Sequence, residues 1–212
     1  MRTTAELLLL LVVLADLAVL GTSRLRACIR AVAAQGLLLG LLPLALASGV
    51  TVHTAGLAAG TVLVKAVVLP WFLLWAIREA SVRREVEPVV GYVASLLLGA
   101  LALALAFAIS ARLPTADVRE PLLVPAALAT VMMGLVVLTT RRKALTQVVG
   151  YLMLENGIYL FGLTQTESVP FLLEVGVLLD VFAGVFIMGI VVFHINREFD
   201  SLDSARLSEL KD

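Results

Sequence analysis

The chain of 212 residues is poor in the residue types that build catalytic and metal centres. It has one cysteine, Cys28, and two histidines, His53 and His194, which lie far apart in the sequence. A single cysteine excludes a disulfide framework and an iron–sulfur cluster held by this chain, and two distant histidines argue against haem or zinc ligation by it alone. The sequence also lacks a glycine-rich phosphate loop, a Ser/His/Asp set and a Cys-x-x-Cys motif. Nothing in it resembles a catalytic site.

Charge is equally scarce. Charged residues make up 15% of the chain and their formal charges cancel to a net charge of 0, so there is no basic surface for nucleic acid. Hydrophobic residues make up 61%, and the mean hydropathy is +1.05. A soluble domain is nearer half apolar and a quarter charged. We therefore expect a membrane protein with little of its mass outside the bilayer.

Seven apolar runs are long enough to cross a bilayer, which takes about 20 residues of helix. They lie near 4–21, 30–49, 55–77, 89–110, 121–140, 145–165 and 170–195. The predicted fold class is therefore all-α, a polytopic membrane protein with seven transmembrane helices. Residues 1–21 can also be read as a signal peptide, but Asp16 interrupts the apolar region and arginines follow Gly21, as in a cytoplasmic flank.

The lysines and arginines predict the orientation. Twelve of the sixteen fall in the first, third and fifth connections and in the tail, three fall on the opposite side, and Lys65 lies inside the third span. By the positive-inside rule, this asymmetry places the N-terminus outside and the C-terminus in the cytoplasm.

Glu155 is the most informative single residue. It lies in an apolar stretch with no cation within ten residues on either side, where an ionised carboxylate costs about 3 kcal/mol on insertion scales. Gln147, Tyr151, Glu155 and Tyr159 follow one another at intervals of four, so they share one helix face. Such a group is retained when a partner pairs with it, water hydrates it or protons pass through it.

Two further ionisable groups lie near mid-membrane depth, Lys65 in the third span and Asp180 in the seventh. One cation does not neutralise two acids, so at least one carboxylate is expected to be protonated, hydrated or paired with another chain, and a protonated acid can exchange its proton. Asp16 and Glu174 lie nearer span ends, where they can reach water. We predict a proton relay of Glu155, Asp180 and Lys65, with Glu174, Tyr151, Tyr159 and Asp16 as possible additional members. The alternative is a structural ion pair that only fixes helix packing.

Two features of the second and third spans concern packing. Pro70 removes the backbone hydrogen bond to the Ala66 carbonyl, so a kink is expected near Lys65. The glycines of these spans, among them Gly36 and Gly56, are expected to let helices pack closely.

The last third of the chain resembles a known family. The basic loop 141–143 and the following Gly150-Tyr151-Leu152-Met153-Leu154-Glu155-Asn156 are similar to the small 4L (K-type) subunit of respiratory complex I and the C subunit of multisubunit cation/proton antiporters. Asp180 stands where that family usually has glutamate. With four further spans before it, the chain looks like component E of hydrogenase-4-type complexes, and Glu174 fits that version. This resemblance divides the chain into four N-terminal helices (1–119), a three-helix unit (120–198) and a cytoplasmic tail (199–212).

The resemblance implies a function. It implies a non-catalytic membrane subunit of a hydrogenase-4, formate hydrogenlyase-like or complex I-like assembly, in a bacterial or archaeal cytoplasmic membrane. No cofactor is expected in this chain, and the nickel–iron and iron–sulfur centres are expected in partner subunits. The implied partners are antiporter-like pump subunits, a quinone-subunit-like membrane anchor and, through them, a [NiFe] hydrogenase-type peripheral arm. A subunit of a cation/proton antiporter and a purely structural membrane scaffold are the alternatives.

Overall fold

The computed structural model describes residues 2–47, 49–79, 90–113, 120–164, 176, 179–189 and 193. Every regular element in these ranges is a helix, which confirms the all-α class. The elements are α1 (Arg2–Gly21), α2 (Leu25–Leu46), α3 (Val52–Thr61), the π-helix η1 (Val62–Val68), α4 (Leu69–Glu79), α5 (Tyr92–Ser110), α6 (Leu123–Thr140) and α7 (Ala144–Thr164). A shorter apolar helix, Leu179–Gly189, follows.

Five helical stretches are long and apolar enough to cross a membrane: Thr3–Gly21, Leu25–Leu46, Thr54–Arg78, Tyr92–Ser110 and Leu123–Thr140. They coincide with the first five predicted spans. The sixth predicted span is α7, whose 21 residues give a length of about 32 Å at helical rise, but Gln147, Glu155 and Asn156 lower its hydropathy. The seventh lies partly outside the described residues, so the count of seven and the orientation stay predictions.

One boundary differs from the sequence-based prediction. The second helix begins at Leu25 and not near residue 30, so Arg26 and Arg30 lie on α2 and the connection from α1 is only residues 22–24. Arginine is a good helix former, so Arg26 and Arg30 are compatible with the first turns of α2. The helix begins directly after Arg24, whose backbone is extended.

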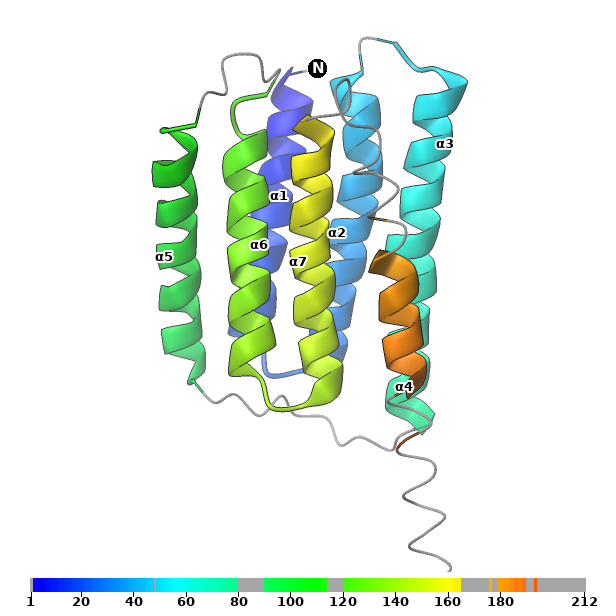
Figure 1. Cartoon of the computed structure of the whole chain (residues 1–212), viewed down its shortest axis with the longest axis vertical. Coiled ribbons are helices and arrows are strands. Elements are labelled where there is room, and N and C mark those ends of the chain that lie inside the picture. The colour runs from blue at the N-terminus through cyan, green and yellow to red at the C-terminus, as the bar shows by residue number, and fades with distance from the viewer. Residues whose placement is uncertain are drawn as a thin grey trace, which may run out of the picture.

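The helices form a bundle in which α7 is central (Figure 1). In this view α6 and α7 lie in front of α1 and α2, α5 flanks α6, and the α3–η1–α4 stretch stands at the other side next to α2. The orange helix Leu179–Gly189 lies beside the lower part of that stretch. The α1–α2 and α6–α7 connections lie at the same end of the bundle, opposite the N-terminus.

The contact between α6 and α7 is a close backbone packing. A Cβ placed on Gly134 of α6 would lie 2.5 Å from the Leu154 nitrogen, and one on Gly150 of α7 would lie 2.6 Å from the Leu138 nitrogen. Helices in a bilayer associate through van der Waals contact and not through exclusion of water, so small residues that let backbones approach are favoured there. This packing holds α7 against α6 on the side opposite its polar face.

The α3–η1–α4 stretch is one helix interrupted by a π-turn. The predicted disturbance near Pro70 takes the form of η1, in which the Leu69 N–H donates to the carbonyl of Val64, five residues before it. A π-turn widens the helix and shifts the side chains that follow relative to an α-helical register, and such turns are frequent at functional sites. Lys65, at the middle of η1, is 5% exposed.

Gly36 of α2 allows η1 to come close. A Cβ at Gly36 would lie 2.6 Å from the backbone carbonyl carbon of Lys65, so any other residue would displace η1. The prediction of close packing therefore holds for Gly36, whereas Gly56 of α3 faces open space.

Arg141 ties together the end of the bundle at which α1 and α6 finish. Its side chain is 2% exposed, Nη2 donates to the Leu20 carbonyl at 2.9 Å, and the guanidinium lies 5.4 Å from the centre of the Tyr92 ring. A cation that binds the last carbonyls of a helix also complements the helix dipole. Burial lowers the pKa of the Arg141 guanidinium, and the neighbouring Tyr92 and Cys28 oppose that shift.

Candidate functional site

Seven of the buried polar side chains form two clusters that meet on α7. The cluster that we call the lysine triad consists of Lys65, Glu155 and Asp180. The cluster that we call the Asp16 network consists of Asp16, Gln35, Thr130 and Asn156. All seven residues are at most 7% exposed, and Glu155 and Asn156 are adjacent in sequence.

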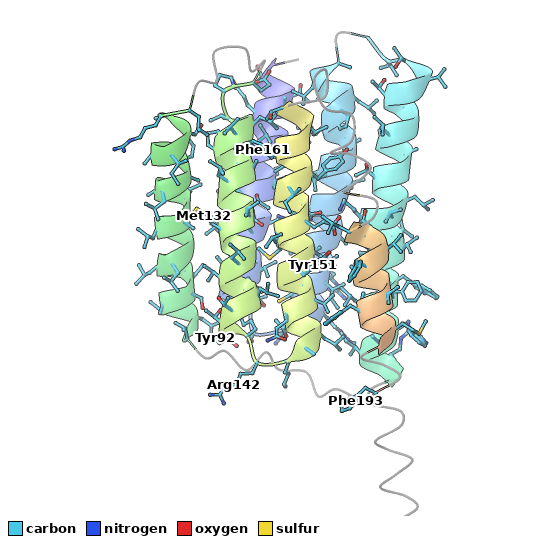
Figure 2. All side chains as sticks on the ribbon, in the orientation of Figure 1. Tyr92, Met132, Arg142, Tyr151, Phe161 and Phe193 are labelled. Atoms are coloured by element: carbon cyan, nitrogen blue, oxygen red, sulfur yellow. The ribbon has the colours of Figure 1, made fainter. Side chains whose placement is uncertain are left out.

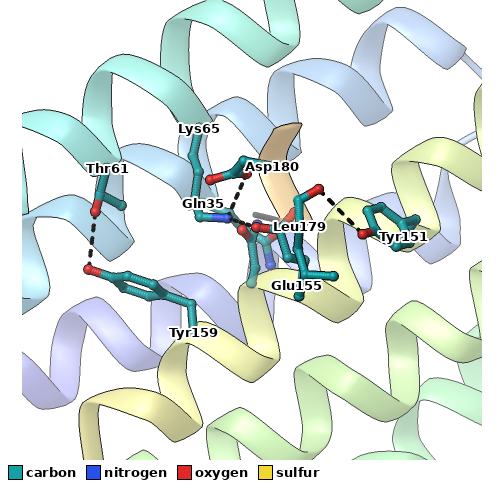
Figure 3. A network of polar contacts seen from close by, with 9 residues as sticks. Gln35, Thr61, Lys65, Tyr151, Glu155, Tyr159, Leu179 and Asp180 are labelled. Atoms are coloured by element: carbon teal, nitrogen blue, oxygen red, sulfur yellow. Dashed lines mark hydrogen bonds and ion pairs between the residues drawn. The ribbon is translucent and has the colours of Figure 1, made fainter. Parts of the chain in front are cut away.

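Lys65 lies between the two carboxylates of the triad. Its ammonium Nζ donates one hydrogen bond to Glu155 Oε1 and another to Asp180 Oδ1 at 3.0 Å. The three side chains come from η1, α7 and the helix Leu179–Gly189, and Figure 3 shows them converging between these helices. The structure therefore brings together the three residues that the sequence singled out at mid-membrane depth.

The triad has one more acid than base. If all three groups are ionised, it carries a net negative charge in a site where both carboxylates are less than a tenth exposed. Both acids contact the same nitrogen, so they lie near each other, and two neighbouring carboxylates disfavour double ionisation. Glu155 Oε2 has no hydrogen-bond partner among the described residues. The arrangement accommodates one exchangeable proton on the acid pair.

The predicted polar face of α7 continues on both sides of Glu155. One turn before it, the Tyr151 hydroxyl donates to the Leu179 carbonyl at 3.3 Å. One turn after it, the Tyr159 hydroxyl is 3.2 Å from Thr61 Oγ1, and Lys65 Nζ lies 5.9 Å from the centre of the Tyr159 ring. Figures 2 and 3 show Tyr151 between α7 and the helix Leu179–Gly189. Tyr151 therefore connects α7 to the helix Leu179–Gly189, which supplies Asp180, and Tyr159 connects it to the α3–η1–α4 stretch, which supplies Lys65.

The triad is tightly packed. The cleft beside it, lined by Val32, Lys65, Leu69, Leu152, Asn156 and Asp180, is too narrow to hold a water molecule. Its groups therefore interact by direct contact in this conformation. A relay through the triad requires water to enter or side chains to move.

The Asp16 network joins four helices. Gln35 Nε2 of α2 donates to Asp16 Oδ1 at 2.6 Å, and Thr130 Oγ1 of α6 donates to Asp16 Oδ2 at 2.8 Å. Asn156 Nδ2 of α7 donates to Gln35 Oε1 at 3.3 Å. Asp16 is 0% exposed, so the expectation that its position near a span end lets it reach water is wrong: α2 and α6 enclose it.

Sequence reasoning missed Gln35 and Thr130 as site residues. Gln35 carries a signal that could have found it, because it is the one strongly polar side chain in the otherwise apolar stretch 31–47. Thr130 carries none, since a threonine in a membrane helix commonly bonds to its own backbone.

The remaining predicted site residue, Glu174, lies outside the described residues. Gly176, one turn before Asp180, is buried, and a Cβ on it would lie 4.0 Å from Tyr159 Cδ2. Within the described ranges, no group of three or more His, Cys, Asp or Glu side chains is placed to hold a metal ion. The location of redox centres in partner subunits remains a prediction.

The chain is similar to known proteins along most of its length. The chain is 37% identical over 207 residues to the uncharacterized protein Rv0085 of Mycobacterium tuberculosis, with 94% of this chain and 92% of that protein covered. It is 29% identical over 156 residues to hydrogenase-4 component E of Escherichia coli K12 and of Shigella flexneri, with 73% of this chain and 72% of each relative covered. No family model matches the chain, and no solved structure does.

Proposed function

The chain belongs to the same family as Rv0085 of Mycobacterium tuberculosis, and from this premise we propose that it is an integral membrane subunit of a hydrogenase-4-like or complex I-like assembly. The likeness to hydrogenase-4 component E and the five long apolar helices support the proposal. The chain would lie as a multi-pass protein in a bacterial or archaeal cytoplasmic membrane. The end of the bundle with the α1–α2 and α6–α7 connections, where Arg24, Arg26 and Arg142 lie, would face the cytoplasm.

In this assembly the lysine triad would be part of a proton-translocation path. The single observation that carries this role is the contact of one buried lysine with two buried carboxylates from different helices. Moving Lys65 toward one acid leaves the other unpaired and favours its protonation, whereas moving it back favours release of the proton. A shift in the position of η1 or of the helix Leu179–Gly189 would therefore change which acid holds the proton.

The chain would supply no redox chemistry itself. Nickel–iron and iron–sulfur centres would lie in the peripheral arm, and this subunit would connect the membrane anchor of that arm to antiporter-like pump subunits. Redox events would drive transport only if they bias the two positions of Lys65 differently, because a ligand or partner moves an equilibrium only through a differential interaction with its two states.

The test is Glu155→Gln in the complete complex reconstituted into vesicles. We expect assembly and electron transfer to persist and proton translocation to be lost, because the amide keeps the shape of the side chain and cannot exchange a proton. Glu120→Gln is the matched control, since it is the same substitution at a buried glutamate just before α6, and it should pump like the unmodified complex.

Two outcomes would overturn the proposal at different levels. If Glu155→Gln and Asp180→Asn both pump normally, the triad only holds the helices together. If the purified chain brings with it ion-transporting subunits but no nickel-containing subunit, the assembly is a cation/proton antiporter and not a hydrogenase-like complex.

A further inference from the structure

The hydrogen bonds of the Asp16 network all run in one direction. Asn156 donates to Gln35, Gln35 donates to Asp16, and Thr130 donates to the second oxygen of Asp16. Gln35 Nε2 also lies 3.3 Å from the Val12 carbonyl, so its amide nitrogen is held on the α1 side. This pattern fits an ionised Asp16, because an ionised carboxylate only accepts hydrogen bonds whereas a protonated one also donates.

Asp16 has no ionisable hydrogen-bond partner that would account for its burial. Within the described residues, the side chains that bind it are an amide and a hydroxyl, neither of which titrates. The helix α1 itself also carries Arg2 and Glu6, and of the helices packed against it, α2 carries Arg26, Cys28 and Arg30, α5 carries Tyr92 and α6 carries none. The helix α7, which packs on α2 and α6, carries Tyr151, Glu155 and Tyr159. Of these, Glu155 is covalently adjacent to a member of the network, Asn156.

The two amides link Asp16 to the triad without offering a proton path. A carboxamide donates through nitrogen and accepts through oxygen, so it does not pass a proton on as a hydroxyl or a water does. It can, however, reverse. A protonated Asp16 would donate to the Gln35 oxygen, the Gln35 nitrogen would turn to Asn156, and the Asn156 nitrogen would lose its acceptor.

At Asn156, the series of hydrogen bonds that begins at Asp16 comes next to the triad. Asn156 lines the same narrow cleft as Lys65 and Asp180. Reversal of its amide would therefore exchange a donor for an acceptor next to Asp180, one of the two acids that share the triad proton, and next to Lys65, which contacts both acids. Linked hydrogen bonds in a medium of low dielectric constant polarise one another, so a change in one bond alters the strength of the others in the series.

We propose that Gln35 and Asn156 are coupling residues that make the protonation of Asp16 and that of Glu155 depend on each other, without a proton passing between them. The inference rests on the proposed function in that it treats the triad as a protonatable site. It adds Asp16, outside the three-helix unit 120–198, as a third acid beside the two of the triad, and its protonation would affect the triad through two reversible amides. By linkage the effect is reciprocal, so a change at either acid alters the other equally.

The test is an infrared titration of the full chain in lipid nanodiscs. The carbonyl band of protonated Asp16 is identified by its loss in Asp16→Asn, and its midpoint pH is compared with and without Glu155→Gln. We expect Glu155→Gln to move the midpoint by on the order of one pH unit, the size at which two sites titrate as a coupled pair. In the background of Gln35→Met, which keeps the length of the side chain and removes its hydrogen bonds to Asp16, Asn156 and the Val12 carbonyl, the movement should fall below about a third of that.

Thr130→Val is the matched control. It removes a donor to Asp16 that lies outside the amide chain, so it should alter the midpoint itself while Glu155→Gln still moves it by the full amount. An equal movement in the presence and absence of Gln35 would overturn the proposal, as would no movement in the otherwise unmodified chain. Asn156→Leu removes the hydrogen bond between Asn156 and Gln35 and should give the same result as Gln35→Met.

A second measurement uses the unmodified protein, so it does not depend on whether the Gln35 and Asn156 variants fold. The side-chain amide bands of isotope-labelled asparagine and glutamine should contain a component that changes with the same midpoint as the Asp16 band in the unmodified chain. Amide bands that stay constant through that midpoint would overturn the proposal. Neither result depends on proton pumping, so normal pumping by Glu155→Gln would refute the relay and leave the coupling intact.

Discussion

Replacing Lys65 with methionine should destabilise the bundle more than any single change to the two acids. Methionine keeps the length and apolar stem of lysine but removes the ammonium that contacts both Glu155 and Asp180. Two buried acids then face each other with no counter-charge. By contrast, Glu155→Gln leaves Lys65 and Asp180 as a balanced pair of one base and one acid.

The expected size follows from this charge count. Removing one partner of a buried ion pair costs about 3–5 kcal/mol, because it leaves an uncompensated charge in a medium of low dielectric constant. For a chain of this length, each kcal/mol lowers the unfolding temperature by about 2–4 °C, so Lys65→Met should lower it by about 6–20 °C. The triple change Lys65→Met, Glu155→Gln and Asp180→Asn removes every charge of the triad and should recover most of that loss.

Thermal unfolding of the purified chain in nanodiscs measures these differences. Circular dichroism would follow helix loss at one pH and one lipid composition in four proteins: the unmodified chain, Lys65→Met, Glu155→Gln and the triple change. The reasoning would be refuted if Lys65→Met unfolded at the same temperature as the unmodified chain. It would also be refuted if the triple change were no more stable than Lys65→Met, since the loss would then come from packing and not from unpaired charge.

Two further predictions concern packing and orientation. Gly36→Ala should destabilise the chain by about 1–3 kcal/mol, because the new Cβ would lie 2.6 Å from the Lys65 backbone, whereas Gly56→Ala, at an open position on α3, should be neutral or stabilising by up to about 1 kcal/mol; equal unfolding temperatures would contradict the close approach. In intact cells, a membrane-impermeant maleimide should label Val52→Cys, which is 92% exposed where α3 begins, and should label Arg142→Cys, which extends from the α6–α7 connection (Figure 2), only after the membrane is opened. Cys28 is 1% exposed and should stay unlabelled in both experiments; the reverse labelling pattern would place the N-terminus in the cytoplasm.

The sequence by itself determined the properties that are local to one helix. The all-α class follows from runs of about 20 apolar residues, since only a helix satisfies every backbone group of a single segment within a bilayer. The polar face of α7 follows from the interval of four residues between Tyr151, Glu155 and Tyr159, because helical geometry alone places them in line. The importance of Glu155 follows from the cost of a carboxylate in an apolar segment.

Only the tertiary structure decided which groups meet. Lys65 is 90 residues from Glu155 and 115 from Asp180, and no periodicity within one helix specifies a partner at such a separation. The π-turn η1 and the missing side chain of Gly36 set the direction and depth at which Lys65 enters the bundle.

Asp16 shows the same division most clearly. From its place near a helix end it looks accessible to water, yet it is fully buried, because Gln35 and Thr130 approach it from two other helices. The cost of burying a charge is a property of one residue and can be read from the sequence. The groups that offset that cost are supplied by helix packing, which the order of residues along one helix does not reveal.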